Sequence, residues 1–236
     1  FAHIHELDSA VKGMKMLLDD EGVIVIEAPY AIDLIEHLEY DTIYHQHVGY
    51  LSVRPMQDYF EKFGLELFDV DYKRIHGGSL RYYIGHKDAH PIASSIEKYL
   101  DKEEQFGLYK KEILDQFTRR VEKQRLDLID LLLSLKKEGK KIAGVSAPAK
   151  GNTLLNYCHI DTTYLDFLTE KSELKIGRFS PGTFIPIYED KKIMDDKPDY
   201  ALILAWNFAD EIMENMKEFK KKGGKFIIPI PRPKVI

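Results

Sequence analysis

The sequence predicts an α/β protein with a first region that ends in an antiparallel hairpin and a second region in which helices alternate with short strands. Two observations predict this class. Apolar residues recur at helical spacing in several segments, and short apolar runs bounded by glycine or charged residues lie between them. Between residues 92 and 138 no strand pattern occurs, so a helical connection is expected to separate the two regions.

The first region covers residues 1–88. Its expected elements are a helix, a strand, a helix and two strands, over residues 7–18, 23–26, 55–63, 65–72 and 79–86. Pro55 suits the first turn of the second helix, and Gly64 suits its end. The Gly77-Gly78 pair indicates a turn between the last two strands, which predicts a hairpin appended to the α/β pattern.

Residues 89–138 predict the helical connection. Charged residues alternate there with Ile, Leu and Phe at steps of three and four, and no proline follows Pro91 before residue 138. A charged helix face is typical of a solvated surface, so no partner is inferred from it.

Residues 139–236 predict a second region with its own sheet. Strands are expected at residues 141–145, 166–169, 200–205 and 225–230, with helices from residue 151 and over residues 209–221. Helices between short apolar strands indicate a parallel sheet covered on both faces. This region is therefore predicted to be a small, doubly wound, Rossmann-like domain.

Composition excludes several classes of protein. The 236 residues include 34 Lys plus Arg and 39 Asp plus Glu, for a net charge of -5, which excludes a generically basic nucleic-acid binder. The longest uncharged apolar runs, such as residues 200–208, are far shorter than the roughly 20 residues that cross a bilayer. Cys158 is the one cysteine, which excludes an intrachain disulfide framework and is typical of a reducing compartment. We expect a cytoplasmic protein without a membrane or nucleic-acid partner; the oligomeric state is not predicted.

The run Tyr44-His45-Gln46-His47 is the strongest local feature. It follows the strand at residues 23–26, and ligands of open α/β sheets bind beyond the carboxyl ends of strands. An imidazole can act as a general base near neutral pH, and the Tyr44 hydroxyl can stabilise an oxyanion. The paired histidines, repeated at His3 and His5, also match a two-His metal arm, but no carboxylate or cysteine stands at a fixed spacing, so no metal site is predicted.

A βα turn at residues 144–153 has the composition of a phosphate site. Its small residues let the backbone approach an anion, while Ser146 and Lys150 supply a hydroxyl and a cation at a helix amino terminus. It is neither a Walker A nor a GxGxxG sequence, so a purely structural turn is an equal alternative. Arg178 is a candidate second cation for a diphosphate, with a surface turn as the alternative.

Two further motifs are candidates for ligand contacts. Trp206-Asn207 follows the strand at residues 200–205, where Trp206 would stack on a base or sugar or would simply pack. The run from His76 to Arg81 is first a tight turn, with Arg81 as its candidate anion ligand.

Taken in order, these motifs resemble the S-adenosylmethionine-dependent C-methyltransferases that act on nucleotide-linked keto-deoxysugars. The resemblance runs through essentially all 236 residues, and its motifs lie at residues 41–47, 76–81, 147–158, 177–183 and 204–212. Several long motifs in one order make the resemblance far more specific than any one of them.

The resemblance implies three parts in order: a zinc-binding segment, a Rossmann domain that binds S-adenosylmethionine, and a Rossmann-like domain that helps hold the sugar nucleotide. Phe1 resembles a position just after the fourth strand of the second part. The zinc segment and the glycine-rich cofactor loop are therefore expected upstream of this chain, which has no GxGxG and no cysteine cluster. By the same resemblance, residues 1–88 are the rear of the methyltransferase domain, residues 89–138 the connection, and residues 139–236 the sugar-nucleotide domain.

The resemblance also implies a mechanism, in which a base removes the proton next to the sugar ketone and the resulting enolate carbon takes the methyl group. His47 matches the base, Tyr44 an active-site tyrosine, and His3 a histidine near the methyl-transfer centre. Gln46 stands where many members carry Glu, so we expect a different substrate or a different protonation state. Phe184 and Glu170 are further departures, where His and Asp are common. The residues expected to bind the substrate are Ser146, Lys150, Asn152, Arg178, Trp206, Asn207 and Arg81.

Two other functions compete with this one. The first is a sugar-nucleotide-binding module without catalysis, or an inactive fragment, since the cofactor loop is not in this chain. The second is a His-dependent metallohydrolase, which would hold stoichiometric zinc.

Overall fold

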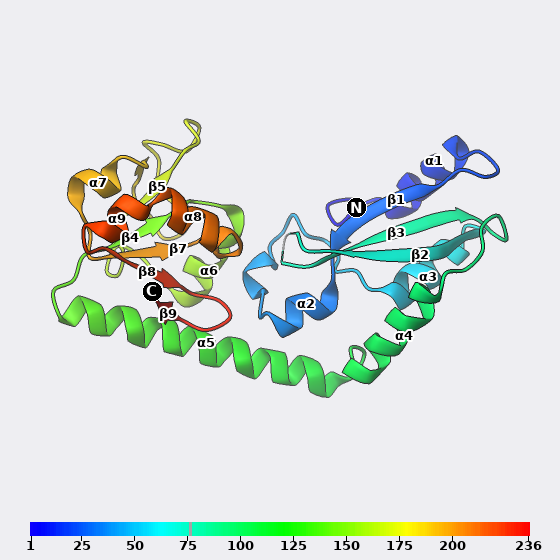
Figure 1. Ribbon diagram of the computed structural model, residues 1–236, viewed down its shortest axis with the longest axis horizontal. Coiled ribbons are helices and arrows are strands. Elements are labelled where there is room, and N and C mark those ends of the chain that lie inside the picture. Colours follow the sequence, from blue (N-terminus) through cyan, green and yellow to red (C-terminus); the bar gives the residue numbers. More distant parts are fainter. Residues whose placement is uncertain (76) are drawn as a thin grey trace. The chain divides into compact units, whose positions relative to one another are not determined.

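The computed structural model describes residues 1–75 and 77–236, which form two compact units (Figure 1). Unit 1 comprises Phe1–Leu38 and His45–Phe117, and unit 2 comprises Glu39–Tyr44 and Thr118–Ile236. The short segment Glu39–Tyr44 thus interrupts unit 1 in sequence but belongs to unit 2 by its contacts. Among the helices of the described residues, none is long and apolar enough to cross a membrane.

Unit 1 is built on a three-stranded sheet in the order β1-β3-β2. The strands are β1 (Ile24–Pro29), β2 (Leu65–Lys73) and β3 (Ser79–His86). β3 runs antiparallel to both neighbours, which confirms the predicted hairpin. Gly78 in the hairpin turn has φ +133°, and a Cβ there would clash with the Asp33 carboxylate, so the turn requires glycine.

The hairpin returns its second strand, β3, between β1 and β2. β1, the strand before Tyr44-His45-Gln46-His47, therefore pairs antiparallel with β3.

The helices of unit 1 bury the apolar face of this sheet. They are α1 (Leu7–Leu17), α2 (Ala31–Glu36), α3 (Val53–Glu61) and α4 (Ser94–Phe106). Leu80, Tyr82 and Ile84 alternate along β3 and are fully buried against helical residues such as Phe60. α3 begins two residues before Pro55 because Glu103 of α4 accepts hydrogen bonds from the amide of Val53, at 2.6 Å, and from the amide of Arg54, at 3.2 Å.

Unit 2 is built on a six-stranded sheet in the order β6-β5-β4-β7-β8-β9. The strands are β4 (Ile142–Val145), β5 (Phe167–Glu170), β6 (Ile187–Glu189), β7 (Tyr200–Ile203), β8 (Lys225–Ile228) and β9 (Lys234–Val235). All pairs are parallel except β8 with β9. The predicted parallel sheet is therefore confirmed, with one short antiparallel strand added at its edge.

Helices cover both faces of this sheet. They are α5 (Lys111–Lys137), whose first residues belong to unit 1, and α6 (Ala149–Cys158), α7 (Lys192–Asp196), α8 (Ala209–Asn215) and α9 (Lys217–Lys221). Figure 1 shows α7, α8 and α9 on one side and α5 on the other. Ala143, Ala201 and Ile203 pack with the first group, whereas Gly151 of α6 lies against Leu204 on the opposite face. The predicted doubly wound arrangement is observed.

Some boundaries differ from the sequence prediction. The helix expected from residue 151 begins at Ala149, which places Lys150 in its first turn. The helix expected over residues 209–221 is two helices, because Met216 between them has φ −106° and ψ 23°. β6, β9, α2 and α7 have six residues or fewer, too few for a repeating apolar pattern to show.

Candidate functional site

The segment that precedes the histidines is buried in unit 2. The 3₁₀ turn η1 (Tyr40–Thr42) lies against α6, and Glu39, Tyr40 and Asp41 are at most 5% exposed. The Tyr40 hydroxyl donates to Gln124 Oε1 at 2.7 Å, and Gln124 Nε2 donates in turn to the carbonyl of Pro229 at 2.7 Å. The segment is thus held by a polar chain through the interior of unit 2.

Asp41 belongs to a group that includes three residues predicted to bind substrate. The indole Nε1 of Trp206 donates to Asp41 Oδ2 at 2.7 Å. Lys150 Nζ lies 4.2 Å from the centre of the Trp206 ring and donates to Asn207 Oδ1. Lys150 and Asn207 come from α6 and from the 3₁₀ turn η2 (Trp206–Phe208) after β7. We call Asp41, Lys150, Trp206 and Asn207 the Asp41 cluster.

Burial sets the charges of the Asp41 cluster. It raises the pKa of Asp41 to about 6, although the Lys150 ammonium and the hydrogen bond from Trp206 act in the opposite direction. Burial also lowers the pKa of Lys150, while Asp41 and Glu39 act to raise it. Lys150 therefore already faces carboxylates, and an incoming anion has to compete with them.

Sequence reasoning missed Asp41 and Glu39 as parts of this site. The signal that could have found them is the acidic run Glu39-Tyr40-Asp41 next to the histidines. Among the described residues, Asp41 Oδ1 and Asn152 Oδ1 are buried without a hydrogen-bond partner. Such atoms are candidates for contacts with a bound ligand or water.

The βα turn after β4 is already occupied by a side chain. The amide of Ala147 donates to Glu170 Oε2 at 3.1 Å, and Lys175 Nζ donates to the same oxygen at 3.0 Å. Glu170 Oε1 accepts from the amides of Lys171 and Ser172 at 2.9 and 3.3 Å. The phosphate-binding role expected for this turn stays a prediction, and the Ala147 amide is not free for it.

Burial acts to raise the pKa of Glu170, but the hydrogen bonds from Lys175 and the three amides outweigh it and hold that pKa below the usual range. The Glu170 carboxylate is therefore ionised at neutral pH and stays on the turn. Ser146 of the same turn is half-buried, with φ +68°.

The two arginines expected to bind substrate lie in different units. Arg178 is exposed in the loop between β5 and β6 of unit 2, and its carbonyl accepts from the amide of Ile187 at 2.9 Å. Arg81 is on β3 of unit 1, where its Nε donates to Glu27 Oε2 at 2.6 Å. His76, in the same motif as Arg81, lies outside the described residues.

His3 and His47 are brought together in unit 1. Their rings stack with centroids 4.9 Å apart at an interplanar angle of 16°, and the amide of Val48 donates to the carbonyl of Ala2 at 2.9 Å. His47 is half-buried, while His3 is exposed. The structure thus places the two histidines side by side, and their catalytic roles stay predictions.

The neighbours of His47 in sequence differ in their surroundings. Gln46 is exposed, and Tyr44 is half-buried in unit 2. Burial, and to a lesser extent the Asp41 carboxylate, raise the pKa of Tyr44, so its phenol stays protonated and can donate a hydrogen bond. Across residues 1–75 and 77–236, no three His, Cys, Asp or Glu side chains gather closely enough to hold a metal ion.

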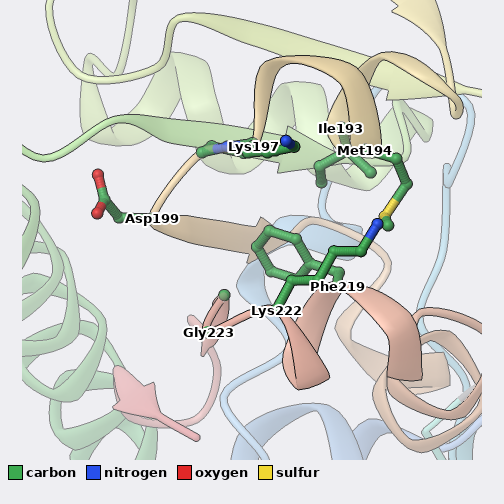
Figure 2. A pocket seen from close by; sticks show the side chains of 9 residues that line it. Ile193, Met194, Lys197, Asp199, Phe219, Lys222 and Gly223 are labelled. Carbon is green, nitrogen blue, oxygen red and sulfur yellow. The ribbon is translucent and has the colours of Figure 1, made fainter.

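Two pockets of unit 2 lie at opposite edges of its sheet. One of about 690 Å³ lies at the carboxyl ends of β4 and β5 and is lined in part by Ser146 and Glu170. A smaller one, of about 100 Å³, lies at the opposite edge, where Figure 2 shows Lys222 extending along Phe219. Ligands of parallel α/β sheets bind at the carboxyl edge, so the larger pocket is the better candidate.

Comparison with known proteins identifies the family of the chain. Residues 74–231 match the family described as C-methyltransferase C-terminal domain. The chain is 35% identical over 237 residues to C-methyltransferase NovU of Streptomyces niveus, an alignment that covers 100% of this chain and 56% of that protein. The chain thus spans little more than half the length of this relative. On the family match, which includes α6, Trp206 and Asn207, the chain belongs to the C-methyltransferase C-terminal domain family.

Proposed function

We propose that this chain is the base-bearing and substrate-binding part of a C-methyltransferase. The whole protein would transfer a methyl group from S-adenosylmethionine to a carbon next to the ketone of a nucleotide-linked keto-deoxysugar. The family match and the name of the relative support methyl transfer to carbon. The sugar substrate rests on the resemblance of the ordered motifs.

One structural observation carries the proposal. The hydrogen bond from Trp206 to Asp41 joins motifs that are 165 residues apart in sequence, and Lys150 adds a third motif to the same cluster. Asp41 lies six residues before His47 in the chain. The segment that leads to the base is therefore anchored to the residues that we assign to the substrate.

In the proposed reaction, His47 takes the proton from the carbon next to the sugar ketone. The C–H bond breaks, the proton goes to a ring nitrogen of His47, and the electron pair is shared with the ketone oxygen to give an enolate. The protonated phenol of Tyr44 donates a hydrogen bond to that oxygen and so stabilises its charge. His3, stacked on His47, orients the imidazole.

The substrate diphosphate is proposed to bind unit 2 through Lys150, with Ser146, Asn152, Asn207 and Arg178 as further ligands and Trp206 against the sugar or base. Because Lys150 faces Asp41 and Glu39, the diphosphate replaces part of their interaction with the ammonium group. Arg81 of unit 1 remains a proposed anion ligand. To bind an anion through Nε, it would have to break its hydrogen bond to Glu27.

The methyl donor is part of the proposal for the whole protein, and the βα turn of unit 2 does not fit it. In a dinucleotide-binding fold, an acidic side chain binds the ribose hydroxyls and the amides of the βα turn bind the phosphates. Here Glu170 already accepts four hydrogen bonds, one of them from the Ala147 amide of the turn, so neither group is available for these contacts. No contact of this chain with S-adenosylmethionine is assigned.

Proton exchange in the whole enzyme tests the proposal. Incubated in deuterated buffer without methyl donor, a thymidine-diphosphate-linked keto-deoxysugar is expected to gain deuterium next to its ketone. His47→Gln should slow this exchange by about 10²-fold or more while leaving the dissociation constant of the sugar nucleotide nearly unchanged. His45→Gln, an exposed histidine two residues away, is the matched control and should exchange normally.

The competing functions give different results in the same experiment. Tight binding of the sugar nucleotide without deuterium uptake by the unaltered enzyme would indicate a binding module. If the His47→Gln variant exchanged deuterium at the normal rate, His47 would not be the base, but the proposed substrate class would still hold.

A further inference from the structure

The pocket of about 690 Å³ is a second candidate site in unit 2. It lies at the carboxyl ends of β4 and β5 and beside Ala205, just after β7. β4 has β5 on one side and β7 on the other, so the strand order reverses there. Small molecules bind open α/β sheets at this position, and their pockets typically measure roughly 300–1,000 Å³.

This pocket is distinct from the Asp41 cluster. Of the described residues that line it, none is Asp41, Lys150, Trp206 or Asn207. Ala205 lines the pocket, whereas its neighbour Trp206 turns its indole to Asp41. A ligand in the pocket therefore does not need the cation that we assign to the substrate diphosphate.

One wall of the pocket is apolar and unusually accessible. Met194 of α7 and Ile212 of α8 are half-buried, as is Met216, and Phe208, which also lines the pocket, is 50% exposed. Thioether and aromatic side chains adapt well to flat rings. Such a wall suits the body of a heteroaromatic compound.

The charged groups of the pocket disfavour phosphate. The carboxylates of Glu170, Asp190, Glu211 and Glu218 outnumber the ammonium groups of Lys171 and Lys191. Glu170 is also saturated by its four hydrogen bonds, so it does not bind ribose hydroxyls as the acid of a dinucleotide fold does. Asn215 remains as a polar side chain for the edge of a ring. Ser146 lines the pocket as well, but it is assigned to the substrate diphosphate and is not used here.

We propose that this pocket binds an uncharged or cationic heteroaromatic compound of nucleoside size and excludes its phosphorylated form. The apolar wall holds the ring, and the surplus of carboxylates repels a phosphate group. The inference does not depend on the proposed methyl transfer, because it uses neither His47 nor Lys150.

Calorimetric titration of the whole chain with adenosine, uridine and 1-methylnicotinamide tests the proposal, with AMP and UMP as phosphorylated partners of the first two. At least one uncharged or cationic probe should bind saturably, and for a bound nucleoside the monophosphate should bind at least tenfold more weakly. Failure of all three to bind, or equal affinity for nucleoside and monophosphate, overturns the proposal.

Matched variants locate the binding. Ile212→Gln should lower the affinity for the bound probe at least tenfold. Met213→Gln, at the next position of α8 and outside the lining of this pocket, should leave that affinity unchanged. If Ile212→Gln does not fold, Met216→Gln serves the same purpose. Unchanged affinity in a folded pocket variant places the probe elsewhere and overturns the assignment. Glu211→Gln combined with Glu218→Gln removes two of the carboxylates that repel phosphate. This double variant should therefore bind the monophosphate with an affinity closer to that of the nucleoside.

Discussion

At the scale of single residues, Asp41 is a buried carboxyl group that positions a segment of the chain rather than adding stability. Asp41 is fully buried, and its ionised form is disfavoured by burial even with Lys150 and Trp206 beside it. A group of this kind rarely adds net stability, because desolvation offsets the attraction of its partners. Its value here is that it fixes the segment before His47 in one arrangement.

Asp41→Asn should change how stability depends on pH. The pKa of Asp41 rises from 3.8 to about 6 on folding, so the protein binds a proton there that the unfolded chain has already lost. The stability from this group is therefore present below pH 4 and lost as the pH rises through about 6. Relative to the variant, the unaltered protein should lose on the order of 2–3 kcal/mol of unfolding free energy between pH 4 and 7.

Urea unfolding at a series of pH values measures this difference. Asp210→Asn, the same substitution at an exposed position, is the control and should keep the pH dependence of the unaltered protein. Parallel profiles for Asp41→Asn and the unaltered protein would contradict the argument.

Gln46→Glu tests the residue that departs from the family pattern. A carboxylate one residue before His47 stabilises the imidazolium, so the pKa of the proposed base should rise. Because position 46 is exposed, solvent screens the effect, and the acidic limb of the pH–rate profile should move up by at most about 1 unit. Methylation rates of the whole enzyme against pH check this, with Gln46→Asn as the uncharged control. If Gln46→Glu changed neither the pH profile nor the preference among sugar nucleotides, the charge at this position would not matter.

At the scale of elements, the start of α3 depends on another helix. Ser52 at its amino end makes no side-chain cap, and the amides of Val53 and Arg54 in the first turn donate instead to Glu103 of α4. Glu103 also accepts from the hydroxyls of Tyr30, at 3.2 Å, and Tyr109, at 2.5 Å. The position of α3 is therefore a tertiary property, which explains why Pro55 alone misplaced its start by two residues.

Glu103→Ala should destabilise unit 1 strongly. The substitution leaves one buried amide, one part-buried amide and two hydroxyls without this acceptor, at a cost of roughly 3 kcal/mol or more in unfolding free energy. Glu104→Ala, on the exposed neighbouring position of the same helix, should change it by less than about 0.5 kcal/mol. Chemical denaturation followed by circular dichroism measures both. Equal, small effects would mean that Glu103 has little part in holding α3.

At the scale of the whole molecule, two units with separate cores share one chain that passes between them more than once. The segment Glu39–Tyr44 is the shortest stretch of chain that belongs to one unit and is flanked in sequence by the other. It ends three residues before the proposed base, His47. It is attached to unit 2 by the packing of η1 against α6 and by polar contacts with Trp206, Lys150 and Gln124.

Trp206→Phe should loosen this segment without unfolding either unit. The change keeps the aromatic body but removes the donor to Asp41, which leaves a buried carboxylate oxygen unpaired at a cost of roughly 1–3 kcal/mol. Hydrogen exchange of the amides of Thr42 and Ile43 should accelerate about 5- to 150-fold if they exchange by local opening. Amides of the β1–β3 pairing in unit 1 are the internal control and should be unchanged. Equal acceleration in both places would indicate global destabilisation instead.

Much of the secondary structure could be predicted from sequence because its signals are local. The return strand over residues 79–86 was predicted to the residue, since a glycine pair and alternating apolar residues define it. The break at Met216 and the three-residue strand β6 could not be, because packing rather than pattern decides them. The division into residues 1–88, 89–138 and 139–236 as functional domains stays a prediction.

The candidate site was predictable in part for the same reason. Lys150, Trp206 and Asn207 follow strands of a parallel sheet, and the carboxyl ends of such strands meet at one edge. Asp41 was missed because its partner Trp206 is 165 residues away, and nothing local reports that contact. The occupation of the βα turn by Glu170 was missed likewise, since it joins the ends of two strands.

By itself, the sequence determined the α/β class, the order of most elements and the family, because apolar periodicity, turn residues and ordered motifs are all written along the chain. Only the tertiary structure decided which charges face each other: Asp41 with Lys150 and Trp206, Glu170 with the βα turn, Glu103 with α3. Those pairings depend on burial and on distances between elements. A buried charge is costly unless it is paired and hydrogen-bonded, and here its partners come from elements distant in the sequence.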